Sequence, residues 1–169
     1  EISLGLVGSE MCIRDRVKPY DPDTLKMIEG IESDKFDTAP YSEGCRYETD
    51  KGEKVRSKSE VIIANLLNGY CDVLRYQYEK PLYLENDGTE VMVHPDFTVY
   101  NLITGKIIYW EHAGMIDDTE YASDFVRKYN LYLANGFIPC DNLMITFECQ
   151  EKPLDIGNVK RIINKIAER

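Results

Sequence analysis

The stretch that decides the fold is residues 93–114, which read VHPDFTVYNLITGKIIYWEHAG. Residues 91–100 and 106–112 are rich in β-branched and aromatic side chains, and the segment between them ends in glycine. This pattern predicts two antiparallel strands joined by a short turn.

The register of this hairpin brings two acids together. If residues 102–105 form a four-residue loop, Tyr100 pairs with Ile107 and Asp96 lies opposite Glu111. A shift by two residues makes the acids diagonal neighbours but keeps them on one face, because side chains alternate with period two. Like charges opposed across a ladder destabilise a sheet by up to roughly 1 kcal/mol, so a cation between the carboxylates is expected. Oxygen ligands alone favour Mg²⁺ or Mn²⁺.

Composition sets the class of protein. The 169 residues fit one domain, and 43% hydrophobic with 30% charged residues indicate a soluble globular chain without a membrane span. The formal charge of −10 argues against a broad nucleic-acid surface, because phosphate binding relies on Lys and Arg, so any DNA contact must be local. The spacing of Cys45, Cys71, Cys140 and Cys149 matches neither a zinc motif nor a dense disulfide framework, and it favours reduced thiols in a cytoplasmic protein.

The first third of the chain divides into two segments. Residues 6–16, LVGSEMCIRDR, look like a translated sequencing-library adapter, so residues 1–16 are treated as an artefact and left out of the fold prediction. Residues 17–54 are predicted to hold a short helix that begins at Asp21-Pro22, followed by an irregular linker. The folded core is expected over residues 55–169.

The core has a regular order of elements. The patterns predict helices over residues 58–68, 119–135 and 156–167, and strands over residues 73–84, 91–100, 106–112 and 143–148. Ser57 and Glu60 satisfy the capping-box pattern at the first of these helices, and Asp117-Asp118 is expected to cap the second. The order αβββαβα suits an α/β fold with a central mixed sheet flanked by helices.

Helical spacing selects two further charged residues. Glu60 shares a stripe with Ile63 and Leu67 and so turns toward the sheet, although its capping role alone also accounts for it. Lys128 lies within an aromatic stripe made of Tyr121, Phe125 and Tyr132. A lysine in such a stripe either has a charged partner or snorkels to water, and both alternatives remain open.

The constellation resembles the PD-(D/E)xK nuclease superfamily, which has the restriction-endonuclease-like fold with an αβββαβ core. The resemblance covers residues 56–165. Pro95-Asp96 and Glu111 match the strand motif, and Glu60 matches the acid of the first helix. The closer resemblance is to uncharacterised bacterial and phage proteins with this domain at their C-terminus, and it is carried by residues 55–65, 76–79, 94–97 and 110–112. One position departs from the pattern, because Ala113 stands where the superfamily has lysine.

The resemblance implies a set of site residues. Asp96, Glu111 and Glu60 would hold one or two Mg²⁺ or Mn²⁺ ions, helped by the main-chain carbonyl of His112. Lys128 resembles the lysine that several branches of the superfamily carry on the following helix. The imidazole of His112 is expected on the opposite sheet face, as a proton shuttle or in a structural hydrogen bond. A metal role for this ring would need a bulge at residues 113–114.

The function implied is metal-dependent hydrolysis of a phosphodiester, with a DNA endonuclease of bacterial or phage origin as the expected form. A narrow track of basic residues would reach the phosphates, made of Lys54, Arg56, Lys58 and Arg127. Two alternatives remain open. A nuclease-fold module that binds nucleic acid or protein without cutting is favoured by Ala113 and by the charge of −10. The other alternative is an unrelated structural α/β module, in which nothing would explain why two acids lie opposite each other in the sheet.

Overall fold

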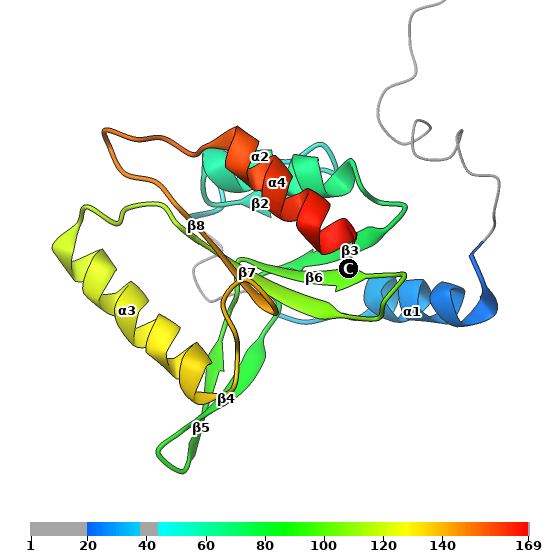
Figure 1. Ribbon diagram of the computed structural model, residues 1–169, viewed down its shortest axis with the longest axis horizontal. Helices are drawn as coiled ribbons and strands as arrows, with labels where there is room; N and C mark the ends of the chain where they lie inside the picture. Colours follow the sequence, from blue (N-terminus) through cyan, green and yellow to red (C-terminus); the bar gives the residue numbers. More distant parts are fainter. Residues whose placement is uncertain (1–19, 38–43, 169) are drawn as a thin grey trace, which may run out of the picture.

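The computed structural model describes residues 20–37 and 44–168, so the interpretation of residues 1–16 lies outside the described part. At its centre is a four-stranded sheet in the order β3-β6-β7-β8 (Figure 1). Its strands are β3 (Leu74–Tyr78), β6 (Phe97–Asn101), β7 (Ile107–Ala113) and β8 (Leu143–Phe147). Strands β3, β6 and β7 are antiparallel neighbours, and β8 is parallel to β7. The predicted mixed sheet is confirmed.

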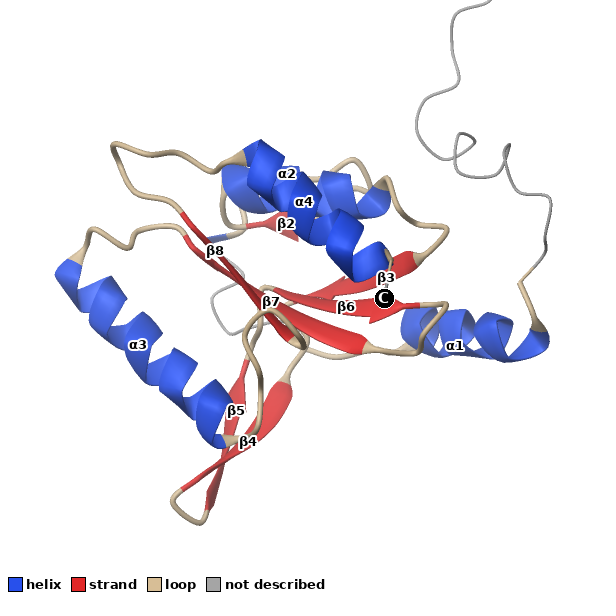
Figure 2. Ribbon diagram, viewed as in Figure 1, coloured by secondary structure: helices blue, strands red, loops and turns tan. Residues whose placement is uncertain are grey.

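Helices cover both faces of this sheet (Figure 2). α2 (Lys58–Asn68) and α4 (Ile156–Ala167) pack together over one face and enclose the larger apolar core. α3 (Thr119–Ala134) lies on the other face and joins the parallel strands β7 and β8. α1 (Pro22–Ser33) lies beside β3. The prediction of an α/β fold with flanking helices is therefore confirmed at this level.

The two faces of β7 have different neighbours. Trp110 is fully buried in the core that α2 and α4 enclose, whereas Tyr109 packs on the other face in the cluster that contains Tyr132 of α3. This alternation is expected for a strand that is covered on both faces. Glu111 therefore shares the α3 face, and His112 shares the face of α2 and α4.

The predicted register of the hairpin is confirmed, because Tyr100 pairs with Ile107. Buried Asn101 holds the turn that follows: its Oδ1 accepts hydrogen bonds of 2.9 Å from the main-chain N–H groups of Ile103 and Thr104. Its Nδ2 donates to the carbonyl of Ile166 in α4 at 2.8 Å. One side chain therefore closes the turn and ties the hairpin to the last helix.

Two of the predicted strands are wrong in length. The strand predicted over residues 73–84 divides into β3 and β4 (Leu82–Asn86), and the strand over residues 91–100 divides into β5 (Thr89–Val93) and β6. Pro81 and Pro95 stand at the two breaks, where they have no N–H to give to a ladder, and Glu79 adopts a positive φ of 50°. β4 and β5 pair with each other and project from the sheet beside α3 (Figure 1).

The segment predicted as an irregular linker contains a small second sheet. β1 (Tyr47–Glu48) and β2 (Lys54–Val55) pair antiparallel. Val55 is fully buried in the core with α2, so apolar burial at one position is enough to order the end of this polar segment.

The helix starts follow the predicted caps. The Ser57 side chain accepts from the N–H of Glu60 at 3.1 Å and the Glu60 carboxylate accepts from the N–H of Ser57 at 3.3 Å, which completes the capping box. Asp118 caps α3 by accepting from the N–H of Tyr121 at 2.8 Å. The bounds of α2 and α4 are as predicted, and α3 ends one residue earlier.

The cysteines agree with expectation at three positions. Cys45, Cys140 and Cys149 are free thiols. Cys71 is disulfide-bonded, so the expectation of a reduced thiol is wrong there, because sequence spacing does not determine which thiols meet in space. None of the helices in the described ranges has the length and apolar character that a membrane crossing requires.

The turn residue Asn101 offers a test of the hairpin. Replacing Asn101 with alanine removes the acceptor of two part-buried hydrogen bonds, from the Ile103 and Thr104 N–H groups, and the donor of a buried one to the Ile166 carbonyl, so we expect the free energy of unfolding to fall by about 1–3 kcal/mol in urea denaturation. The matched control is Thr104→Ala, on the exposed part of the same turn, which should change it by no more than about 0.5 kcal/mol. Equal effects of the two substitutions would contradict the role given to Asn101.

Candidate active site

The β6–β7 hairpin brings Asp96 and Glu111 together. The ladder ends with Phe97 paired to Trp110, so the next position places Asp96, just before β6, opposite Glu111. The Asp96 Oδ2 atom accepts a hydrogen bond of 2.6 Å from the main-chain N–H of His112. Glu111 is buried. The two acids that the sequence singled out therefore face each other at one end of the sheet.

α3 supplies a positive charge to this pair. The Nζ atom of Lys128 lies 2.7 Å from Oε1 of Glu111 and donates to the carbonyl of His94 at 2.9 Å. The hydroxyl of Tyr132 donates to the same Glu111 oxygen at 2.6 Å. The sequence left two alternatives for Lys128, a charged partner or an ammonium that snorkels to water, and the structure shows the charged partner.

Burial and repulsion set the protonation of the site. Burial, followed by the charge of Glu111, raises the pKa of Asp96 well above its ordinary value, against the opposing effects of Lys128 and the His112 N–H. Burial alone would lower the pKa of Lys128, but the charges of Glu111 and Asp96 outweigh it, so the pKa is raised and the ammonium persists. Burial beside Glu111 also raises the pKa of Tyr132, which stays a hydrogen-bond donor. A cation beside Asp96 would take the place of the proton that its raised pKa favours.

Glu60 is held by the chain just before α2 and by Tyr78 of β3. Its Oε2 accepts hydrogen bonds of 2.8 Å from the main-chain N–H of Arg56 and from the hydroxyl of Tyr78, besides the capping box. Its charge still raises the pKa of Asp96, so it stands within electrostatic reach. Across residues 20–37 and 44–168, no set of three or more His, Cys, Asp or Glu side chains is arranged to hold a metal ion. Of the three acids expected to act together, Asp96 and Glu111 face each other, whereas Glu60 is held by Arg56 and Tyr78.

His112 brings its main chain to the site and its ring to the opposite face, as expected. Its N–H holds Asp96, and its carbonyl accepts from the hydroxyl of Tyr121 at 3.4 Å. On the other face, Nδ1 lies 3.0 Å from Oγ1 of Thr146 and Nε2 lies 3.2 Å from Oε1 of Glu148. β7 pairs regularly with β8 as far as residue 113, so no bulge turns the ring toward the acids. The carbonyl, rather than the imidazole, stands beside the site.

Ala113 occupies the position where the superfamily pattern has lysine, and it is fully buried. It shares the strand face of Glu111, since the two residues are two apart. Lys128 reaches Glu111 from α3 instead, so an ammonium is present although the strand does not carry it.

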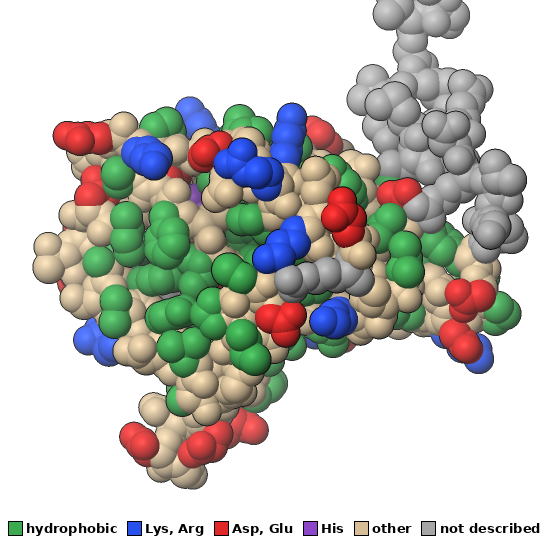
Figure 3. Space-filling model, in the orientation of Figure 1, with side chains coloured by type: hydrophobic (Ala, Val, Ile, Leu, Met, Phe, Trp, Pro, Cys, Tyr) green, Lys and Arg blue, Asp and Glu red, His purple; other side chains and the backbone are tan. Residues whose placement is uncertain are grey.

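The residues expected to form a basic track are mostly paired with acids. The pairs are Arg56 with Glu79 at 2.7 Å, Lys54 with Glu48, and Arg127 with Asp124. Lys58 is exposed in the first turn of α2. On the face in Figure 3, Lys and Arg side chains are spread among acidic and apolar ones. The positive potential available to phosphates is therefore smaller than the sequence alone suggested.

Tyr121 and Tyr132 belong to the site, although the sequence pattern gave them only a place in an apolar stripe. Tyr121 contacts the main chain at both His112 and Gly114, whose N–H donates to its hydroxyl at 3.2 Å. Tyr132 holds Glu111. The choice of tyrosine over phenylalanine was the available clue, because a buried hydroxyl usually has a hydrogen-bond partner.

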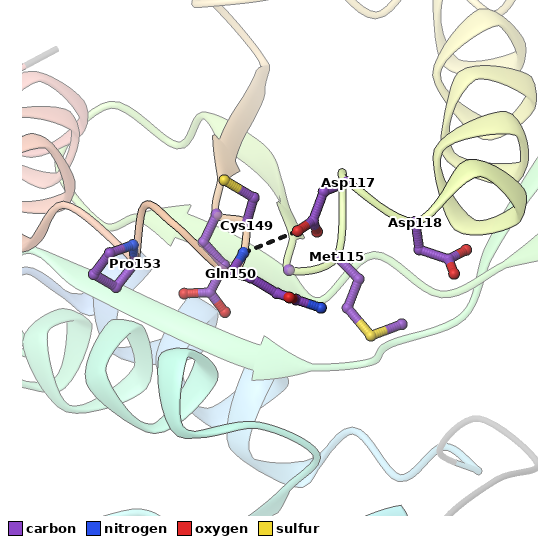
Figure 4. Close-up of a pocket in the computed structure, with 8 residues that line it drawn as sticks. Met115, Asp117, Asp118, Cys149, Gln150 and Pro153 are labelled. Atoms are coloured by element: carbon purple, nitrogen blue, oxygen red, sulfur yellow. Dashed lines mark hydrogen bonds between the residues drawn. The ribbon is translucent and has the colours of Figure 1, made fainter.

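A separate pocket of about 480 Å³ lies at the C-terminal ends of β7 and β8, between the loops that lead to α3 and α4. Asp117 of the first loop accepts a hydrogen bond of 3.0 Å from the N–H of Gln150 in the second, which joins the two walls (Figure 4). The lining residues are Gly114, Met115, Asp117, Asp118, Glu148, Cys149, Gln150 and Pro153. Asp96, Glu111 and Lys128 are absent from this lining, so the pocket is distinct from the carboxylate site.

Comparison with known proteins gives one relative. The chain is 35% identical over 99 residues to an uncharacterized protein of Methanocaldococcus jannaschii, and the match covers 58% of this chain and 8% of the relative. The chain thus spans less than a tenth of that protein. No protein-family model matches the chain. No solved structure matches it either.

The pairing of Lys128 with Glu111 predicts a measurable coupling. Lys128→Met leaves the Glu111 charge buried, so the free energy of unfolding should fall by about 1–3 kcal/mol in urea. Adding Glu111→Gln removes that stranded charge, and the double variant should recover part of the loss. Lys160→Met, on the exposed side of α4, is the control and should cost no more than about 0.5 kcal/mol. If the effects of Lys128→Met and Glu111→Gln on the free energy of unfolding simply add, the interaction between the two side chains is contradicted.

Proposed function

We propose that this chain is a metal-dependent nuclease domain of the PD-(D/E)xK type that hydrolyses phosphodiester bonds of nucleic acid, with DNA as the expected substrate. The observation that supports the proposal is the facing pair of Asp96 and Glu111 with the ammonium of Lys128 beside it. A restriction-endonuclease-like core, a bacterial or phage origin and a cytoplasmic location belong to the same proposal.

The chemistry of the donors fits Mg²⁺ or Mn²⁺. Carboxylate oxygens of Asp96 and Glu111, with the main-chain carbonyl of His112, are the hard ligands that these ions prefer. The pKa of Asp96 is raised mainly by burial and then by the charge of Glu111, and a bound cation would offset the second of these effects. Glu60 would act through its charge or through a water, since its own oxygen is held by Arg56 and Tyr78. When bound, the ion would polarise the phosphate and lower the pKa of a bound water.

The residues of the chain would divide the remaining tasks. Lys128 would stabilise the negative charge that develops on the phosphate, because its ammonium stands at the carboxylate pair in a partly buried position. Tyr132 would keep Glu111 in place through its hydrogen bond to Oε1. The His112 N–H would orient Asp96 in the same way. Each of these groups is carried by a helix or strand, which favours a rigid site.

Calorimetric titration tests the ion. We expect Mn²⁺ to bind the wild-type protein and to bind Asp96→Asn at least about 10-fold more weakly, because one of the two facing carboxylates loses its charge. Asp87→Asn, at the tip of the β4–β5 hairpin, keeps the net charge change the same and should bind as the wild type does. Equal Mn²⁺ binding by the wild type and Asp96→Asn would show that Asp96 is not a metal ligand.

Cleavage assays test the assignment of roles. Lys128→Ala should reduce Mn²⁺-dependent DNA cleavage by about 10²-fold or more, as expected when one electrostatic stabiliser is lost. His112→Ala should cost less, about 10-fold, since its carbonyl stays and only its support is lost. Both variants are compared at a temperature where circular dichroism shows them folded. The reverse order, with His112 essential and Lys128 dispensable, would show that the histidine takes the role of the lysine missing at Ala113.

A second candidate function is a nuclease-fold module that binds without cutting. Two observations favour it: Glu60 is already held by Arg56 and Tyr78, and most of the expected basic track is paired with acids. The two functions differ in one assay. Wild-type protein that cleaves no single-stranded, duplex or branched substrate with Mn²⁺ or Mg²⁺ would favour the binding module.

A further inference from the structure

Glu148 directly follows β8 and joins three separate segments of the chain. Its Oε2 accepts hydrogen bonds from Oγ of Ser59 at 2.7 Å and from the main-chain N–H of Leu154 at 3.0 Å. Its Oε1 lies 3.2 Å from Nε2 of His112. Ser59 and His112 are both buried and the Glu148 side chain is 20% exposed, so these polar contacts are partly shielded from water and the loss of a partner carries a cost.

The donors and acceptors around a neutral His112 ring have one consistent order. Trp110 Nε1 only donates, and it donates to Oγ1 of Thr146 at 3.0 Å. Nε2 of His112 lies 3.2 Å from Oε1 of Glu148 without the angle of a hydrogen bond, and a hydrogen on Nε2 is the arrangement that avoids two acceptors facing each other at that distance. Nδ1 then accepts from the hydroxyl of Thr146, 3.0 Å away. A directed chain of polar contacts thus runs from Trp110 through Thr146 and His112 to Glu148.

Two of the partners of Glu148 are neighbours of site acids. His112 follows Glu111 in β7, and its N–H holds Asp96. Ser59 precedes Glu60 in the first turn of α2. One carboxylate therefore connects the strand that carries Glu111 to the helix that carries Glu60. It does so from the face of the sheet opposite to Glu111 itself.

We propose that Glu148 is a positioning residue of the candidate active site. By holding the His112 ring in its Nε2–H tautomer and Ser59 at the start of α2, it sets where the His112 main chain and Glu60 stand relative to Asp96 and Glu111. This inference rests on the proposed nuclease function. Residues that orient metal ligands in this way typically change metal affinity or activity by about 10- to 100-fold when they are replaced.

The substitution that tests the role is Glu148→Gln. A glutamine side chain has one oxygen and one NH2 group, so it cannot present an acceptor both at the Oε1 position beside His112 and at the Oε2 position that holds Ser59 and Leu154. The matched control is Glu151→Gln, an exposed carboxylate in the same loop. We expect the Mn²⁺ concentration that gives half-maximal DNA cleavage to rise about 10-fold or more in Glu148→Gln relative to the control, with a smaller change in the rate at saturating Mn²⁺. A merely structural role would lower the melting temperature without moving this metal dependence.

A readout on the metal-free protein does not require activity. The chain has two histidines, His94 and His112, so a His94→Gln variant assigns the ring ¹⁵N resonances of His112. The wild type should show the Nε2–H tautomer, and Glu148→Gln should move the population toward Nδ1–H. Ser59→Ala removes only the contact with the helix, and it should raise the half-maximal Mn²⁺ concentration while leaving the tautomer unchanged.

The outcomes separate this inference from the proposed function. If Glu148→Gln and Glu151→Gln share the same Mn²⁺ dependence and the same His112 tautomer, Glu148 has no positioning role, and the nuclease proposal stands. If the wild type neither cleaves nor binds Mn²⁺, the nuclease proposal falls, and the tautomer shift alone decides whether Glu148 positions His112. If Glu148→Gln does not fold, Ser59→Ala carries the comparison of Mn²⁺ dependence, and no change there would overturn the role.

Discussion

Two carboxylates that face each other at the end of the β6–β7 hairpin impose the main electrostatic requirement of this fold. Burial raises the pKa of Asp96 well above its ordinary value, and the nearby charge of Glu111 adds to the rise. The ammonium of Lys128 lies 2.7 Å from Glu111 and offsets the repulsion between the two acids. Lys128 is on α3, the crossover helix between β7 and β8, which also packs on this face of the sheet through the apolar cluster of Tyr132, Leu84 and Leu143. The ion pair and the apolar contacts together place this helix beside the two acids.

β7 is the element on which both sides of the site depend. On the face toward α3, Glu111 meets Lys128 and Tyr132. On the opposite face, His112 meets Thr146 and Glu148. A strand with regular pairing on both edges is a stiff support, so contacts on one face restrict what the other face can do. This geometry is why a residue as far from the acids as Glu148 can bear on their position.

The sequence was most informative where a local rule and a long-range constraint agreed. The four-residue turn and the period of two were enough to pair Tyr100 with Ile107, and the capping box was enough to begin α2 after Ser57. The aromatic stripe around Lys128 placed it on the packed side of its helix and left its partner open. In each case the pattern contained the geometry within a few residues, so little depended on the rest of the fold.

Other features depended on distant partners that no local pattern contains. The division of two predicted strands was marked only by prolines, and the positive φ of Glu79 that turns the chain away is unusual for a glutamate. The pairing of Arg56 with Glu79 joins residues from different elements, so a basic run was mistaken for free positive charge. Glu148 was not singled out at all, because its partners Ser59 and His112 come from two other segments.

The proposed divalent cation site at Asp96 and Glu111 is tested most directly by anomalous X-ray scattering from crystals grown with Mn²⁺. We expect one anomalous peak in contact with carboxylate oxygens of both residues and with the carbonyl of His112. The Lys128 ammonium would then be shifted from Glu111 but still near the peak. Absence of a peak between the two acids at saturating Mn²⁺, with Lys128 still paired to Glu111, would contradict it.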